Sequence, residues 1–235
     1  MRAKWLWDRS ARRLSLPVAL ALVMGAATPA GADQGVMSYY LGLRAIGGQA
    51  MLDDVSNTGF GGTQNVQNDS DVVGGIGIVA GTRFRDLPVR LELEVAHRFR
   101  FDFDVRDQPT GNVIDHEANI ATTSALVSAI VEWRNDTAFT PFVGGAVGWA
   151  RNDVETDRID IATQVKTTTD NETDNFAWGG TAGVDWDFAE SWTAQAAYRY
   201  TDLGKVETGV NSNGESISAD SYTSHDLLLS ILFRF

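Results

Sequence analysis

Apolar and polar residues alternate along several stretches of this chain, which is the pattern of β-strands with two chemically different faces. Residues 89–103 show the pattern most clearly. Their odd positions are Val, Leu, Leu, Val, His, Phe, Phe and Phe, whereas every even position except Ala96 is charged. One face of this predicted strand is therefore apolar and the opposite face carries charge.

Seven further stretches repeat the alternation, and each has one face without Asp, Glu, Lys or Arg, although 21% of the chain is charged. The eight predicted strands cover residues 37–45, 72–84, 89–103, 121–133, 141–149, 176–188, 192–200 and 225–235. Apolar faces that point outward on all strands are typical of a barrel in a membrane. We therefore predict an all-β fold, an eight-stranded antiparallel transmembrane β-barrel with up-and-down order.

The predicted connections alternate in length. Short turns lie near residues 86–88, 134–138 and 189–191, and long polar connections cover 48–70, 104–118, 152–175 and 202–221. Bacterial outer-membrane barrels have short periplasmic turns and longer extracellular loops. Aromatic residues also gather at strand ends, as expected for rings at the level of lipid headgroups. A soluble barrel would point its apolar face inward and would not need these aromatic ends, so we favour the membrane.

The first residues indicate export. A basic segment precedes an apolar run over 14–27, which is too short to span a bilayer as a helix. Small residues at Ala30 and Ala32 form a signal-peptidase pattern. We predict a signal peptide over 1–32, cleavage between Ala32 and Asp33 with Ala30 as the alternative site, and a barrel over 33–235.

Charge and composition exclude several functions. The full chain has a formal charge of −12, and removal of residues 1–32 makes it more acidic, about −16. Nucleic-acid binding needs clustered Lys and Arg, so we expect no such partner. The chain has no cysteine, which excludes disulfides and thiolate metal sites. We expect no cofactor, no metal site and a monomer.

Several segments resemble a known family. Residues 74–84, 140–149 and 198–200 are similar to the second, fifth and seventh strands of the opacity-protein and OmpA-like outer-membrane surface antigens. The chain also ends in Phe233-Arg234-Phe235, which resembles the terminal aromatic signature of that family. The resemblance implies that Phe233 and Phe235 are an assembly signal for the barrel-assembly machinery. It also implies a barrel without the periplasmic peptidoglycan-binding domain of longer relatives.

The inward faces predict a charge network, because an eight-stranded barrel is about filled by its own side chains and buried charges must pair. We assign to this network Arg44, Arg83, Arg90, Glu92, Glu94, Arg98, Arg100, Glu132, Asp185, Arg199 and Arg234. Four further inward charges are expected at Arg85, Asp102, Asp187 and Asp226. A salt-bridged plug is the leading interpretation, and a gated ion path between the pairs is the alternative.

The leading functional hypothesis is a structural or surface-interaction barrel in contact with outer-membrane lipids, lipopolysaccharide or a host. One alternative is an enzyme that modifies lipid A, and another is a narrow ion channel. His97 and His225 face outward, but neither has a Ser two residues along the same face, so we identify no nucleophile. The acidic loops are a solvated surface or, alternatively, bind divalent cations that bridge to lipopolysaccharide phosphates.

Overall fold

The computed structural model describes residues 36–59, 63–67, 70–108, 114–163, 165–211 and 214–235, without the side chains of 57, 63–67, 100–108 and 114–115. Val36–Phe235 form one compact unit. The predicted signal peptide, its cleavage site at Ala32 and Asp33, and the side chains of Arg100 and Asp102 lie outside this description. None of the described residues belongs to a helix that is long and apolar enough to cross a membrane.

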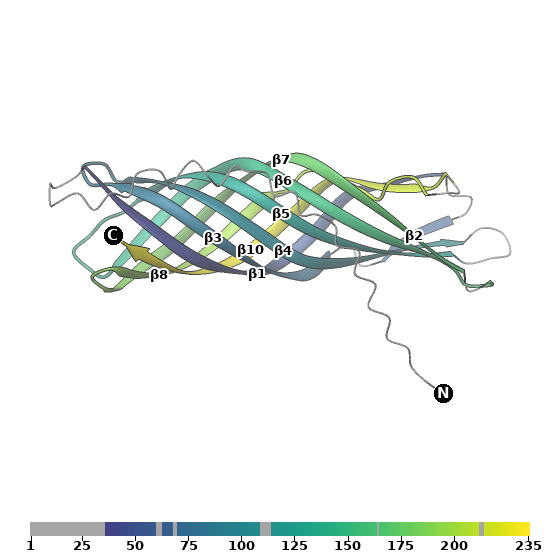
Figure 1. Cartoon of the computed structure of the whole chain (residues 1–235), viewed down its shortest axis with the longest axis horizontal. Coiled ribbons are helices and arrows are strands. Elements are labelled where there is room, and N and C mark those ends of the chain that lie inside the picture. Colours follow the sequence, from purple (N-terminus) through teal and green to yellow (C-terminus); the bar gives the residue numbers. More distant parts are fainter. Residues whose placement is uncertain (1–35, 60–62, 68–69, 109–113, 164, 212–213) are drawn as a thin grey trace, which may run out of the picture. The chain divides into compact units, whose positions relative to one another are not determined.

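The described residues form ten antiparallel strands, eight of which close into a ring (Figure 1). The eight are β1 (Met37–Thr58), β3 (Ser70–Phe84), β4 (Val89–Gln108), β5 (Ile114–Glu132), β6 (Phe139–Asp160), β7 (Val165–Ala189), β8 (Trp192–Asp202) and β10 (Ser216–Arg234). Each pairs with the next along the chain, and β10 pairs with β1. The short strands β2 (Thr63–Gln67) and β9 (Val206–Glu207) pair with β4 and β10. The predicted eight-stranded barrel is confirmed.

The register fixes how far the strands tilt. Directly opposed residues can be followed once round the ring from Tyr39 back to β1, where the path arrives at Gln49, ten residues further along (39 to 49). The path runs through Thr82, Leu91, Ala129, Gly145, Gly180, Tyr200 and His225. Such a stagger requires strands that tilt strongly against the barrel axis, typically by about 35–45°.

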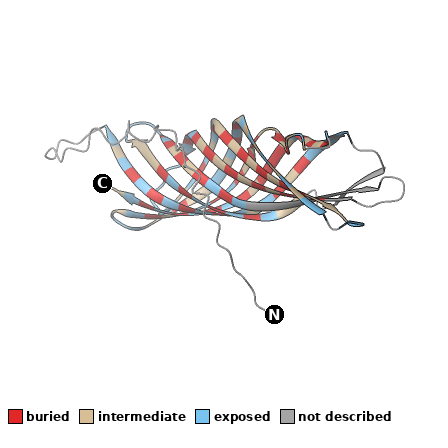
Figure 2. Ribbon diagram, turned by 45° about the vertical axis from the view of Figure 1, so that its right-hand side comes forward, coloured by how far each residue is buried: buried red, intermediate tan, exposed pale blue. Residues whose placement is uncertain are grey.

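The two faces of the barrel wall have the polarity that the alternation predicts. Leu43 is 69% exposed and Val72 is 77% exposed on the outside, whereas Arg90 and Arg98 on the inside are 0% exposed. Figure 2 shows the resulting alternation of buried and exposed residues along the strands. A soluble protein buries its apolar residues and exposes its charges. This barrel does the opposite, so its outer surface requires an apolar surrounding.

The prediction of four long loops is wrong over most of their length. The ranges 48–70, 104–118 and 152–175 consist largely of β-strand, because β1, β4, β5, β6 and β7 continue far past the apolar band. By the band we mean the part of the barrel wall whose outer face is apolar. At this rim only β3 and β8 stop near their predicted boundaries, at Ser70 and Asp202. The opposite rim agrees with the sequence, since short turns connect β3 to β4, β5 to β6 and β7 to β8.

The prolonged strands form what we call the extension, which consists of two sheets. Beyond the band, β2, β4, β5, β6 and β7 pair in that order, and β10 pairs with both β1 and β9. Their inward residues share one apolar core, which includes Leu52, Ile120, Val154 and Ile217. In β1, β5, β6 and β10 the apolar side therefore changes from outside to inside where the wall leaves the band. The extension has its own core and does not consist of solvated loops.

Residues 203–211, which we call the strap, close the extension between β7 and β10. Leu203 and Val206 of the strap are buried in the apolar core. The amide of Asn152 donates to the carbonyl of Leu203 at 3.1 Å, and that of Asn175 donates to the carbonyl of Lys205 at 2.8 Å. The side chains of Asn152 on β6 and Asn175 on β7 thus replace, in the extension, the backbone pairing that β8 provides to β7 in the rest of the barrel.

Candidate functional site

The lumen near the short turns holds a cluster of three arginines and two carboxylates, the inner cluster. Arg83 contacts Glu132 at 2.8 Å and Asp185 at 3.0 Å. Arg90 donates to both carboxylates, at 3.2 Å to Glu132, and its guanidinium lies 4.5 Å from the Phe142 ring. Arg134 reaches back from the β5–β6 turn to Glu132 at 3.0 Å. Residues from five strands are joined here across the lumen.

The middle cluster links two further arginines to Glu92 and Glu94 of β4. Arg199 donates to Glu94 at 2.8 and 2.9 Å, and Arg44 also donates to Glu94. Arg44 contacts Glu92 at 2.9 Å, and the Tyr40 hydroxyl donates to Glu92 at 3.0 Å. All five side chains are buried. Charge-assisted bonds of this kind are stronger than neutral ones, so the cluster crosses the lumen as one network.

The outer cluster lies next along the lumen and is centred on Asp226. Arg98 donates to Asp226 at 2.7 Å, and the Ser224 hydroxyl donates to its other oxygen at 2.6 Å. Arg199 is 3.9 Å from Asp226 and so connects the outer cluster to the middle one. Beyond this level the lining becomes the apolar core of the extension. The charged plug and the apolar outer surface therefore occupy the same length of the barrel.

Some charges differ from the sequence-based assignment. Arg85, expected in the lumen, is exposed in the β3–β4 turn, because β3 ends at Phe84. Arg134, which the sequence places in a turn, supplies a cation to the inner cluster. Arg234 pairs with Asp187 at 2.9 Å at the rim and is partly exposed. Gln195 bridges the inner and middle clusters, since it donates to Asp185 and accepts from Arg44.

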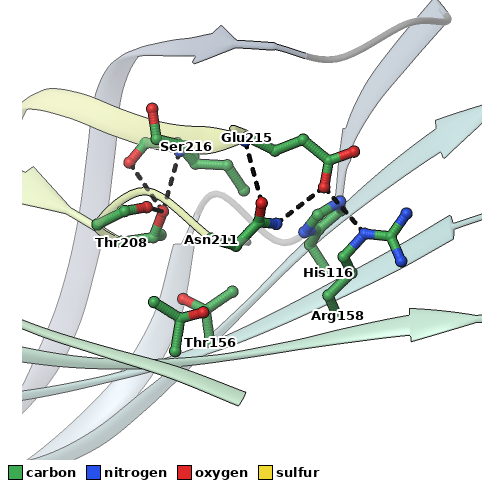
Figure 3. A pocket seen from close by; sticks show the side chains of 10 residues that line it. His116, Thr156, Arg158, Thr208, Asn211, Glu215 and Ser216 are labelled. Carbon is green, nitrogen blue, oxygen red and sulfur yellow. Dashed lines mark hydrogen bonds and ion pairs between the residues drawn. The ribbon is translucent and has the colours of Figure 1, made fainter. Parts of the chain in front are cut away.

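Side chains that line a pocket at the far end of the extension hold the strap in place (Figure 3). Arg158 contacts Glu215 at 2.9 Å, and the Asn211 amide donates to the same oxygen at 2.8 Å. Burial would raise the pKa of Glu215, but the hydrogen bonds from Asn211 and Arg158 and the charges of Arg158 and His116 lower it overall. Among the described residues, no group of three or more His, Asp or Glu side chains could hold a metal ion.

The outward histidines each contact a hydroxyl on the neighbouring strand. His97 Nδ1 lies 3.0 Å from Thr123 Oγ1, and His225 Nδ1 is hydrogen-bonded to the Tyr198 hydroxyl. Each pair joins two neighbouring strands, so the residue pattern along a single strand does not reveal it. Thr123 lies directly opposite Arg151 on the next strand. A hydroxyl and an imidazole are thus paired on the outer wall.

An apolar outer wall, a lumen filled with charge pairs and aromatic rings at both ends define an integral β-barrel of an outer membrane. The sequence model of the family described as "Outer membrane protein beta-barrel domain" matches residues 18–235, and the chain belongs to this family. The resemblance to opacity and OmpA-like barrels is confirmed at this level. The barrel lies in the outer membrane of Gram-negative bacteria, and its short turns are therefore periplasmic.

The chain is similar to three known proteins. Outer membrane protein PagN of Salmonella typhimurium is 27% identical over 213 residues, which are 86% of this chain and 83% of PagN. Neisserial surface protein A is 17% identical with a TM-score of 0.49, covering 84% of this chain and 97% of that structure. Ail of Yersinia pestis, in complex with the heparin analogue sucrose octasulfate, is 12% identical with a TM-score of 0.41, covering 84% and 99%. The strand pairing and the family match, rather than these two structural likenesses, establish the fold.

Proposed function

We propose that this protein is a closed barrel that anchors the extension at the cell surface, where the extension contacts other molecules. The observation that carries the proposal is the division of the interior. The lumen within the membrane is filled with paired charges, and the lumen of the extension holds an apolar core with the Arg158–Glu215 pair at its far end. An interior filled in this way serves stability, so the outer face of the extension is the surface available for contacts.

The outer face of β5, β6 and β7 in the extension is acidic. Asp153 lies directly opposite Glu172, and Glu155 lies directly opposite Asp170. Like charges in directly opposed positions destabilise a sheet. Their presence favours a role in contacts with basic groups over a purely structural role. It also argues against a sulfated polyanion, the kind of molecule in the Ail complex, as a ligand of this face.

Proteoliposomes of phosphatidylcholine test this role without interference from lipopolysaccharide. One population carries the full barrel, and the other carries a barrel in which residues 152–173 are replaced by a four-residue turn. We expect surfaces coated with polylysine to retain the full barrel several-fold more than the trimmed one, with the difference falling as salt is added. Equal retention of the two barrels, or stronger retention on heparin, would contradict the proposal.

A lipid-modifying activity is the second candidate, and the contact of His97 with Thr123 favours it. A hydroxyl beside an imidazole can act as a nucleophile on an acyl ester, with the imidazole as general base. Mass spectrometry of lipid A from cells with the wild-type protein, with His97→Ala and without the protein addresses this candidate. Lipid A that loses acyl chains only with the wild-type protein would establish the activity, and identical spectra would remove it.

A further inference from the structure

The edge of β7 at the top of the extension lacks a neighbouring strand. β7 pairs with β6 along Val165–Trp186, but its pairing with β8 begins only at Trp178. The strap covers part of the stretch of β7 that β8 does not reach, since the Asn171 amide donates to the Glu207 carbonyl at 2.9 Å. Within the described residues, no strand pairs with β7 at Lys166 and Thr168. An unpaired stretch of this kind is a template for another extended chain.

The register shows which residues present their backbone groups at this edge. Asp187 donates its N–H to the carbonyl of Ala138, on the β6 side, and the register between the two strands is unbroken from Val165 to Trp186. Successive residues of a strand direct their N–H and C=O groups to opposite sides. Odd residues of β7 therefore point to β6. Even residues, including Lys166 and Thr168, direct their N–H and C=O groups to the open edge.

The composition of this edge suits an added strand. Residues 167–169 are all Thr, a residue with high β-propensity, and residues 165–170 contain neither Pro nor Gly. Natural proteins protect exposed edges with Pro, bulges or lysines. The lysine here, Lys166, is bound to Asp157 at 2.6 Å, and the Thr168 hydroxyl donates to the same carboxylate at 2.6 Å. Both side chains are therefore drawn toward β6 and leave the edge accessible.

Charge selects the partner. The outer face beside the edge carries Glu155, Asp170 and Glu172, the last of which is 66% exposed at its side chain. We propose that residues 165–170 bind an extended basic peptide by strand addition, with its Lys or Arg residues at alternate positions on the outer face. Main-chain hydrogen bonds would supply affinity, and opposite charges across the strands would supply specificity. The inference rests on the proposed surface-contact function and names its partner.

A second copy of this chain is a poorer occupant of the same edge. Antiparallel self-pairing centred on Thr168 would place Lys166 of each copy opposite Asp170 of the other, whereas pairing centred on Asp170 would place that carboxylate beside its own copy. The two copies would together bring additional acidic residues, including Glu172, onto one face. Like charges directly opposite each other oppose such pairing. A basic strand instead brings opposite charges to Asp170 and Glu172.

The test uses the full chain in phosphatidylcholine nanodiscs and fluorescein-labelled peptides followed by anisotropy. The probe is acetyl-(Lys-Thr)4-amide, the charge control is acetyl-(Glu-Thr)4-amide, and the pattern control is a block isomer with four Lys followed by four Thr. Strand addition requires alternation, so we expect the alternating basic peptide to bind at least about tenfold more tightly than either control. Equal binding of the block isomer would overturn the proposal in favour of general charge attraction.

Two variants locate the binding on the edge. Thr168→Pro removes an edge N–H without removing a bond to β6, and should raise the Kd of the alternating peptide about tenfold or more. Thr168→Ala loses the hydroxyl but keeps the N–H, and should change the Kd less than threefold, on the order of one surface contact. Equal effects of Pro and Ala would overturn strand addition.

The combined change Asp170→Lys and Glu172→Lys should abolish the preference for the basic peptide over the acidic one. An unchanged preference would place the site elsewhere. If the wild-type barrel fails to bind the alternating peptide but is still retained on polylysine, strand addition is refuted and the proposed surface-contact function stands.

Discussion

At the scale of single residues, Glu94 shows how the lumen tolerates its charges. Two arginines from different strands, Arg44 on β1 and Arg199 on β8, donate to this one carboxylate. An isolated buried charge would cost several kcal/mol, and the cost is offset only when every partner is in place. Each member of the network therefore depends on the others, and removal of one leaves the remaining charges uncompensated.

We predict that Glu94→Gln lowers the free energy of unfolding in lipid by about 3–5 kcal/mol, the usual cost of leaving a buried partner unpaired. Urea titration followed by tryptophan fluorescence measures this change. The matched control is Glu190→Gln, because Glu190 is exposed in the β7–β8 turn. The control should differ from the wild type by less than about 0.5 kcal/mol. Equal effects of the two substitutions would mean that the network does not stabilise the barrel.

Glu215 makes the strap sensitive to acid. Its pKa in the folded protein lies below the ordinary value of 4.5. A carboxylate with a lowered pKa contributes stability above its ordinary value and loses that contribution as the pH falls through the lowered one. The fastening of the strap should therefore weaken below about pH 4.5 and remain intact at neutral pH.

Hydrogen exchange of the backbone amides of residues 203–211 measures this prediction. Exchange, corrected for the intrinsic effect of pH, should accelerate in the wild type below about pH 4.5. In Glu215→Gln it should be faster at neutral pH and should lack the acid-dependent increase. An identical acid response in the variant would assign the sensitivity to another group.

At the scale of elements, the last strand packs at the periplasmic rim and carries the predicted assembly signal. Phe235 closes β10 at the periplasmic rim, where its ring stacks near Tyr39 at 6.5 Å and its N–H donates to the Tyr39 carbonyl at 3.1 Å. The ring is 67% exposed, so it belongs to the lipid-facing surface. Full burial of such a ring in apolar surroundings is worth about 1.5–3 kcal/mol, too little to unfold a barrel alone.

Deletion of Phe235 should therefore reduce insertion in cells far more than refolding in detergent, if the terminal ring is also an assembly signal. Heat-dependent mobility on detergent gels measures both, because a folded barrel resists detergent until it is heated. Equal losses in the two assays would limit the role of Phe235 to packing. Unchanged insertion in cells would show that the ring is dispensable.

The alternation of residues was sufficient to predict the eight strands in the membrane, because the two faces there differ sharply in charge. It failed in the extension for a physical reason. Ile120 and Val154 point inward, opposite to the apolar band residues of the same strands, so the apolar face changes sides. A search for one continuous face therefore ends at the edge of the band. The change of side itself was visible in the sequence and could have indicated the prolonged strands.

The candidate site was only partly accessible to sequence reasoning. Alternation placed Arg90, Glu94 and Arg199 on inward faces, but it could not show which charges meet across the lumen. That depends on the ten-residue stagger of the ring, which no single strand reveals. The cross-strand pair of His97 and Thr123 was missed for the same reason. Arg134 lies in a turn, where a side chain follows no period of two.

At the scale of the whole molecule, inside and outside exchange their polarity at the surface of the membrane. Within the band the wall is apolar outside and charged inside, and in the extension it is acidic outside and apolar inside. Each region thus meets its own surroundings, lipid in one case and water in the other. The interior is filled by side chains along both regions, which is the central claim about this barrel.

Planar-bilayer recording of the purified barrel tests that claim most directly. A lumen closed by paired charges predicts no steady conductance for the wild-type protein in 1 M salt, on the order of the background of a protein-free bilayer. Glu94→Gln, which disrupts the pairing but adds no space, should at most produce brief openings. A stable, reproducible open level in the wild-type protein would contradict the account, because it would require a continuous water path through the network.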